Sequence, residues 1–141
     1  MNNSVLQSSA QRVADAYAEI ANRMMGCKLP IPVPLTFDLH NELPKAAGRA
    51  SGLMTVEINM ILFEDNVSHI LNETIPHEIG HLVQYDKFKG VDIQGHGAEW
   101  REIMKRLGKV AHKYHTLDVT RAVVAYKERK KSKKAKKNGD D

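Results

Sequence analysis

The residues best suited to chemistry form the pattern His77-Glu78-x-x-His81. If this stretch is helical, a spacing of four residues places the two imidazoles within about 40° of each other around the helix axis. Two neutral imidazoles on one face supply half of a tetrahedral Zn²⁺ shell. Glu78 lies about 60° from His81 on the same helix, where a carboxylate can take a proton from water at the metal. The spacing therefore predicts a zinc site with a general base beside it.

A third ligand is expected in the glycine-rich segment that follows. Gly95 and Gly97 frame His96, and two glycines leave the backbone free to turn that imidazole toward the preceding helix. Glu99 and Glu102 are the competing ligands, because a helix packed alongside would bring either carboxylate within reach. We prefer His96, since orienting its ring is the simplest use of the two glycines.

Other arrangements fit the site less well. In a metzincin-type pattern, glycine and histidine would stand three and six residues after the second ligand, but this chain has Gln84 and Lys87 there. The remaining histidines near the site are interpreted as solvated residues or as support for the ligands: His69, His112 and His115.

The first two ligands need a helix to hold them. Acidic and cap-like residues at 64–66 precede apolar residues at helical spacing, so we expect a helix from there to about Lys87. Pro76 removes a backbone hydrogen bond and is expected to kink this helix just before the first histidine. Gly80 costs about 1 kcal/mol of helix propensity, which is explained if its missing side chain lets another element approach. A second helix over 98–107 would turn Trp100 toward the core.

The residues before this helix predict one more helix and a small sheet. Residues 8–25 are typical of an amphipathic helix that begins at a capping-box-like Ser8-x-x-Gln11. Its predicted apolar stripe consists of Val13, Tyr17, Ile20 and Met24. Residues 35–39 and 55–62 alternate as strands do, and Gly48 and Gly52 between them indicate a bend or a close approach of the backbone. We expect three short strands in a mainly antiparallel sheet, whose exposed edge could bind an extended peptide.

Length and composition are those of one small α+β domain. The 141 residues are 42% hydrophobic, and the longest apolar run falls far short of the roughly 18 residues of a membrane-spanning helix. The polar start lacks the basic flank and apolar core of a signal peptide, so we expect a cytoplasmic protein without membrane contact. Cys27 is the only cysteine, which excludes an internal disulfide and a cysteine zinc ribbon. We expect it to be a small buried apolar residue.

The basic charge lies at the C-terminal end. Residues 127–141 hold eight Lys or Arg and three acids, so this stretch carries +5, and the rest of the chain carries about −1 of the net charge of +4. The run from Lys127 to Lys137 could neutralise phosphates in a sequence-independent way, or could be a solubilising tail. We expect residues 1–118 to form the domain and residues 119–141 a basic, partly disordered tail that is able to contact DNA.

Taken together, these motifs resemble the SprT/Spartan family of minimal zinc metalloproteases. The resemblance rests on His77-Glu78-x-x-His81, then Gly95-His96-Gly97-x-x-Trp100, and on matches in order between residues 10 and 118. It implies zinc ligation by His77, His81 and His96, with Glu78 as the catalytic base. It also implies a zincin-like fold of N-terminal helix, three-stranded sheet, active-site helix and packing helix. Many relatives have a cysteine zinc ribbon that this chain lacks. The cleavage of DNA-crosslinked proteins by Spartan proteins is therefore carried over to this chain only by analogy.

These observations predict a zinc metalloendopeptidase that hydrolyses proteins, with DNA-bound proteins as one candidate class of substrate. Glu78 would take a proton from water and return it to the departing amine. The group that stabilises the oxyanion stays open among Tyr85, His112, Tyr114 and His115. The main rival is a nucleic-acid-binding accessory protein with a structural zinc ion. A non-proteolytic hydrolase on the same scaffold is a third interpretation.

Overall fold

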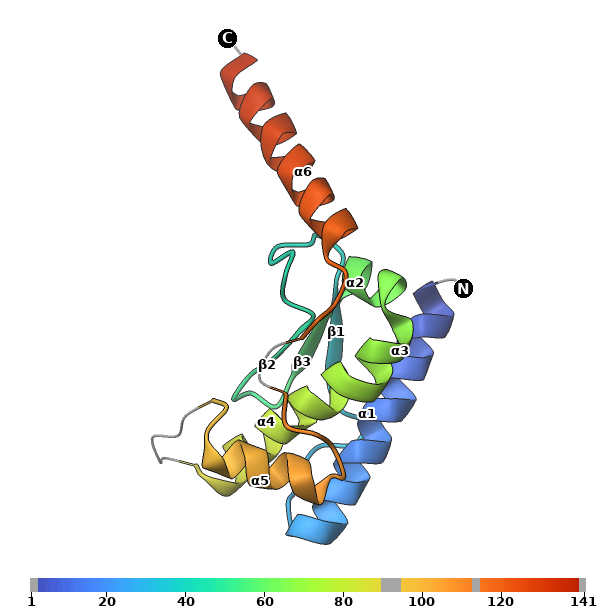
Figure 1. The fold of residues 1–141 in the computed structure, drawn as a ribbon, viewed down its shortest axis with the longest axis vertical. Coiled ribbons are helices and arrows are strands. Elements are labelled where there is room, and N and C mark those ends of the chain that lie inside the picture. The colour runs from blue at the N-terminus through green and yellow to red at the C-terminus, as the bar shows by residue number, and fades with distance from the viewer. Residues whose placement is uncertain (1–2, 90–94, 113–114, 140–141) are drawn as a thin grey trace.

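The computed structural model describes residues 3–89, 95–112 and 115–139, and Figure 1 shows how they are arranged. The helices are α1 (Asn3–Met25), α2 (Met60–Asp65), α3 (Val67–His69), the π-helical turn η1 (Ile70–Thr74), α4 (Ile75–Lys87), α5 (Ala98–Arg106) and α6 (Thr120–Gly139). The strands are β1 (Leu35–Asp38), β2 (Gly48–Ala50) and β3 (Val56–Asn59). The predicted α+β class is confirmed.

Helix α1 lies against α4 (Figure 1). The face of α1 that is buried consists mostly of small side chains. The buried residues recur every three or four positions: Leu6, Ala10, Ala14, Ala18, Ala21 and Met25. Alanine lets two helix backbones approach closely, and larger side chains are left at the flanks. Of the predicted apolar stripe, Val13 and Tyr17 are partly buried and pack against the core, whereas Ile20 and Met24 are exposed, so the prediction holds for only half of it. The helix is confirmed, but it begins at Asn3, so Ser8 does not cap it.

The sheet is mixed, which corrects the prediction of a mainly antiparallel one. Its strand order is β1-β3-β2, with β1 parallel and β2 antiparallel to β3. The chain between β1 and β3 first forms β2 on the far side of β3, so β3 takes the centre and β2 an edge.

Strand β3 also ends earlier than predicted. The Asn59 side-chain oxygen accepts from the Leu62 amide at 3.1 Å and starts α2, so the apolar run that follows is helical.

Pro76 disturbs the helix that carries His77 and His81, as predicted, and the disturbance takes the form of the turn η1. The Ile75 amide donates to the Ile70 carbonyl, one residue further back than in an α-helix. A proline has no amide hydrogen for the carbonyl four residues earlier, and a π-turn shifts the hydrogen-bond register at that point. The predicted single helix is therefore three consecutive segments, α3, η1 and α4, over residues 67–87.

Helix α5 crosses α4 at Gly80, as the missing side chain suggested. A Cβ built on Gly80 would lie 2.9 Å from Trp100 Nε1 and 2.9 Å from Met104 Sδ. A larger residue here would have to displace the Trp100 indole and the end of the Met104 side chain. Cys27 is buried, as predicted.

Helix α6 projects from the body of the protein, and its first turns are tied down (Figure 1). The Asn41 side chain donates to the Ala122 carbonyl at 2.7 Å, and Arg121 binds Asp65 at 3.0 Å. Further along, Arg129 forms an ion pair with Glu42. Residues 119–141 were expected to be partly disordered, but the structure has a helix over Thr120–Gly139. The many Lys, Arg and Ala residues of this segment favour a helix. The domain boundary at residue 118 stays a prediction.

Within the described residues, no helix is both long and apolar enough to cross a membrane.

Candidate metal centre

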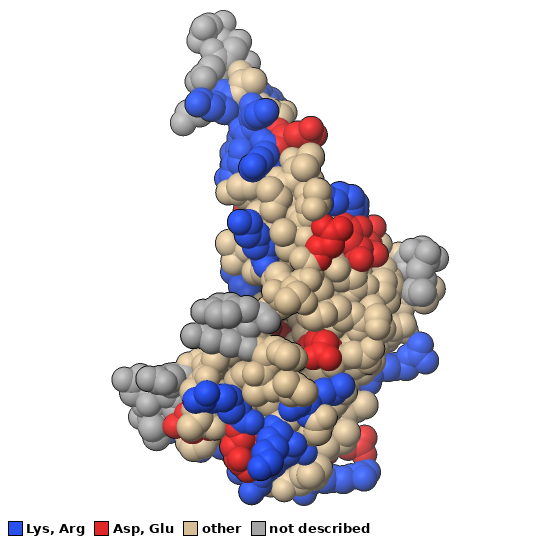
Figure 2. Space-filling model, in the orientation of Figure 1, with Lys and Arg blue, Asp and Glu red and all other residues tan. Residues whose placement is uncertain are grey.

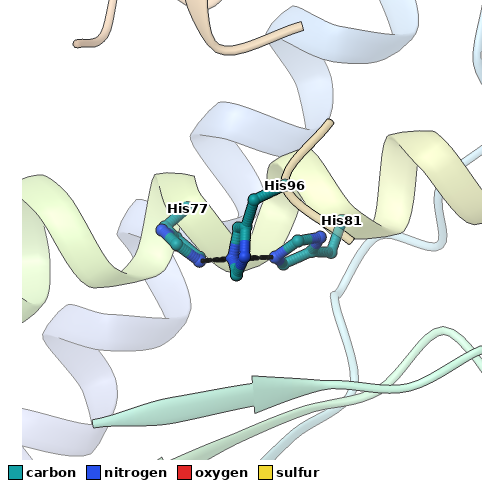
Figure 3. A group of neighbouring side chains, drawn as sticks. All are labelled: His77, His81 and His96. Carbon is teal, nitrogen blue, oxygen red and sulfur yellow. Dashed lines mark hydrogen bonds between the residues drawn. The ribbon is translucent and has the colours of Figure 1, made fainter. Parts of the chain in front are cut away.

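Three histidine rings point toward one another between α4 and the segment that leads into α5 (Figure 3). His77 and His81 project from successive turns of α4, and His96 stands just before the first residues of α5. The Nε2 atoms lie 3.0 Å apart for His77 and His96, 3.1 Å for His81 and His96, and 3.3 Å for His77 and His81. Among the described residues, these three form the group of side chains that could hold a metal ion.

The hydrogen bonds on the outer sides of the rings indicate that a cation fits between them. His81 Nδ1 lies 2.8 Å from the Gln84 side-chain oxygen. An amide oxygen only accepts, so Nδ1 carries the proton and Nε2 presents a bare lone pair. The His77 ring also makes a hydrogen bond to the backbone of His112. Two lone pairs that face each other at 3.3 Å repel unless a cation lies between them. Tetrahedral zinc with Zn–N bonds of about 2.0–2.1 Å needs nitrogens about 3.3 Å apart, which matches.

Burial keeps the ligand rings neutral, which is the form that binds a metal. The pKa of His77 is lowered to about 3, mainly by burial and then by the neighbouring charges of His81 and His96. Burial also lowers the pKa of His81, although its hydrogen bond with Gln84 opposes the shift. Neither ring needs to lose a proton at neutral pH before it can bind a cation.

Trp100 forms the floor beneath all three rings. Its indole is 1% exposed and stacks on His81, with ring centroids 5.5 Å apart and planes 18° apart. The indole contacts the other two rings at 4.7 Å for His77 and 4.9 Å for His96. Its Nε1 donates to the His77 backbone carbonyl at 3.3 Å. The residue predicted to be simple core therefore also sets the positions of the three imidazoles.

Glu78 lies beside the histidines, buried against strand β2. Only 6% of Glu78 is exposed, and a Cβ on Gly48 would come within 3.2 Å of its side chain. The predicted close approach at Gly48 is thus real, whereas Gly52 has open space around it. Burial raises the pKa of Glu78 to about 8, and a hydrogen bond from the Ala50 backbone opposes the rise. A cation in the histidine site would favour the ionised carboxylate by attraction.

The centre opens into a pocket of about 610 Å³. His77, Glu78 and His96 line it, so the predicted base and two of the predicted ligands reach the same space. The rest of its polar wall comes from several parts of the chain: Lys45, His69, Glu73, Thr74, His112, His115 and Thr116.

The structure distinguishes between the residues predicted as alternative third ligands and between those considered for the oxyanion. His96 joins the other two histidines, and neither Glu99 nor Glu102 belongs to their group or lines the pocket. Of the residues considered for the oxyanion, His112 and His115 line the pocket and Tyr85 does not. Tyr114 lies outside the described residues.

Two contributions to the site were missed in the sequence. Gln84 was noted only because it breaks another pattern, yet it orients His81 from three residues away on the same helix. That spacing puts the two side chains on neighbouring positions and could have suggested the contact. The sequence predicted a close approach at Gly48, but it held no signal that the neighbour is Glu78, because that depends on how β2 crosses α4.

Comparisons with known proteins agree with this geometry. The SprT-like family matches residues 17–123. "Protein SprT" of Vibrio parahaemolyticus is 35% identical over 117 residues, which cover 82% of this chain and 67% of that protein. "Protein SprT" of Vibrio atlanticus is 35% identical over 103 residues, covering 72% and 58%. That of Glaesserella parasuis is 41% identical over 66 residues, covering 46% and 41%. The match thus spans between about two fifths and two thirds of these relatives' lengths. No solved structure gives a significant match. The chain belongs to the SprT-like family.

Proposed function

We propose that this protein is a zinc-dependent metalloendopeptidase. The observation that carries the proposal is the convergence of three imidazole Nε2 atoms within 3.0–3.3 Å, beside a buried glutamate that lines the same pocket. Three neutral imidazoles with room for a fourth ligand are typical of catalytic zinc, and structural zinc sites usually close all four positions with protein groups. Within the described residues, no fourth protein ligand joins the group.

Glu78 would move the protons of the reaction. When bound, zinc would supply Lewis acidity for water and for a peptide carbonyl. The buried Glu78 carboxylate would take a proton from the attacking water and return it to the departing amine. Burial raises the pKa of Glu78 and a bound cation would oppose that rise, so the carboxylate would be ionised to accept the proton and able to return it.

Strand β2 is suited to hold a peptide substrate in extended form. It pairs with β3 along one side and is an edge of the sheet. The residues that lead into it, Ala46 and Ala47, and its first residue, Gly48, line the pocket. Main-chain hydrogen bonds along such an edge hold a peptide with little demand on its sequence. A protease for many different proteins needs this kind of binding.

The basic side chains of helix α6 favour the proposal that the substrates are proteins bound to DNA. Figure 2 shows Lys and Arg side chains gathered along its projecting part. The described basic residues are Lys127, Arg129, Lys130, Lys131, Lys133, Lys134 and Lys136. Basic side chains that contact only phosphates read no bases, so such binding would be sequence-independent and weakened by salt. A cytoplasmic, DNA-associated protein is part of this proposal.

One assay tests both parts of the proposal. Zinc-loaded protein is mixed with a DNA-binding substrate protein, with single-stranded, double-stranded or no DNA, and with Glu78→Gln in parallel. We expect the native chain to cleave the substrate protein. We expect Glu78→Gln to keep its zinc but to cleave nothing. Full activity of Glu78→Gln would refute the mechanism. Equal inactivity of both proteins, with DNA bound, would favour the rival hypothesis of an accessory protein with a structural zinc ion. Hydrolysis of small esters without peptides would favour a non-proteolytic hydrolase.

The contribution of α6 is measured separately. Removal of residues 127–141, or Lys→Gln changes at 130, 131, 133 and 134, should weaken DNA binding. The slope of log K against log salt should become shallower by about 0.9 for each phosphate that the variant no longer neutralises. Unchanged DNA affinity at two salt concentrations would eliminate this role for α6.

A further inference from the structure

His115 is one of the pocket residues that the proposed chemistry leaves without a role. Its Nε2 lies 2.6 Å from the Lys45 backbone oxygen, and the Leu117 amide donates to its Nδ1 at 3.3 Å. A carbonyl oxygen only accepts, so Nε2 carries the proton and Nδ1 is the acceptor. Both ring nitrogens therefore have backbone partners, and the ring in this position does not offer a hydrogen to an oxyanion.

The contact joins two distant parts of the chain at the edge of the pocket. Lys45 and His115 are 70 residues apart, and both line the pocket. Lys45 begins the segment Lys45–Gly48, which lines the pocket throughout and is called the pocket wall below. Toward its start the wall is held by a turn, in which the Ala46 amide donates to the Leu43 carbonyl at 3.0 Å. Toward its end the Asn59 amide donates to the Ala47 carbonyl at 3.0 Å.

The pocket wall continues directly into the strand that touches the base. A Cβ on Gly48 would lie 3.1 Å from the Thr74 methyl and 3.2 Å from the Glu78 side chain. Two residues later, the Ala50 backbone makes a hydrogen bond to Glu78. A shift of the wall would therefore move the edge strand relative to the base and would change where a peptide lies.

We infer that His115 is a positioning residue, whose hydrogen bond to Lys45 holds the pocket wall in the conformation that accepts an extended peptide. The inference rests on the proposed peptidase function for its kinetic consequence. Its structural part, the fixing of the wall, does not depend on catalysis. His115 acts through the wall and does not touch the reacting atoms.

Three variants separate this role from the alternatives. His115→Ala removes the donor. His115→Gln keeps an N–H at nearly the position of Nε2 and is the conservative rescue. His40→Ala is the matched control, because His40 is exposed, lies in the loop that leads to the wall and does not line the pocket.

The first measurement is hydrogen–deuterium exchange of the zinc-loaded proteins, which needs no activity. In His115→Ala, amides of residues 46–50 should exchange about 2- to 10-fold faster, as expected for loss of one hydrogen bond. His115→Gln and His40→Ala should exchange like the native chain. Unchanged exchange in His115→Ala would overturn the inference, even if the native chain cleaves no peptide.

The second measurement is the kinetics of peptide cleavage. In His115→Ala, KM should rise about 2- to 10-fold with kcat within about twofold, and His115→Gln should restore KM. A tenfold or larger fall in kcat with an unchanged KM would overturn the inference and make His115 a catalytic residue. If the native chain is inactive, the proposed function fails, and the exchange experiment alone decides the role of His115.

Discussion

Replacing Gly80 with alanine tests the contact between α4 and α5 that supports the metal centre. The new Cβ would lie 2.9 Å from both Trp100 Nε1 and Met104 Sδ, closer than such atoms normally come. The end of the Met104 side chain is flexible and can move aside. The Trp100 indole is buried, donates to the His77 carbonyl and stacks on His81, so its displacement would move the metal ligands.

The sign of the effect follows from opposing contributions. Alanine in place of glycine within a helix stabilises by about 1 kcal/mol. An extra carbon in a packed core costs about 1–3 kcal/mol, and loss of the Trp100 hydrogen bond costs about 0.5–1.5 kcal/mol. The net expectation is destabilisation by about 0.5–3.5 kcal/mol. For a chain of this size, Tm should fall by roughly 1–14 °C. Zinc affinity should also fall, by about tenfold or more, because the ring that supports the ligands is displaced.

Thermal unfolding followed by circular dichroism, and zinc competition with a chromophoric chelator, would measure the two effects of Gly80→Ala. Gly52→Ala is the matched control, since a Cβ there meets nothing within 4 Å. It should change stability by less than about 0.5 kcal/mol and leave zinc affinity unchanged. If Gly80→Ala raised Tm, as helix propensity alone predicts, the close packing of α5 on α4 would be refuted.

Further changes probe the ligand support, the buried polar contacts and the metal itself. Gln84→Leu should weaken zinc binding about 10- to 100-fold, because His81 loses the acceptor that orients its ring. The control Gln7→Leu on α1 should leave zinc affinity unchanged. Equal zinc affinities of the two variants in a chelator competition would contradict this role of Gln84. Asn59→Ala should lower the free energy of unfolding by about 2–4 kcal/mol in a urea titration, since it removes the cap of α2 and a donor to a buried amide oxygen. The exposed Asn72→Ala should cost far less, and similar effects of both changes would argue against the buried contacts. Chelation of zinc should lower stability by about 4 kcal/mol relative to protein in zinc at 1,000 times Kd; an unchanged Tm would mean that the folded state does not bind the ion.

Most of the candidate metal centre could be predicted from the sequence because its signals are local. A helix repeats every 3.6 residues, so the spacing of His77 and His81 places their rings together wherever that helix lies. The glycines around His96 indicated a turn that aims its ring, and Gly80 indicated a close neighbour. Each of these predictions depends on a few consecutive residues, and the structure brings the three histidines together accordingly.

The wrong predictions concern positions where local preference leaves several outcomes possible. Helical periodicity in α1 is satisfied both by the stripe of larger side chains and by the alanine stripe. The closeness of α4 selects the alanines, because only small side chains fit there. Alternation in the strands likewise does not say which neighbours pair, so the parallel pairing of β1 with β3 was missed. The end of β3 was set by the Asn59 cap, which competes with an apolar run that suits either structure.

The sequence by itself thus determined the helix that carries two histidines, the turn that carries the third, and the basic C-terminal segment. Only the tertiary structure decided what surrounds them: Trp100 beneath the rings, Gln84 behind one of them, and β2 against the glutamate. The reason is physical. Ligand spacing is set by the geometry of one helix, whereas burial, the raised pKa of Glu78 and the shape of the pocket arise from segments far apart in the chain.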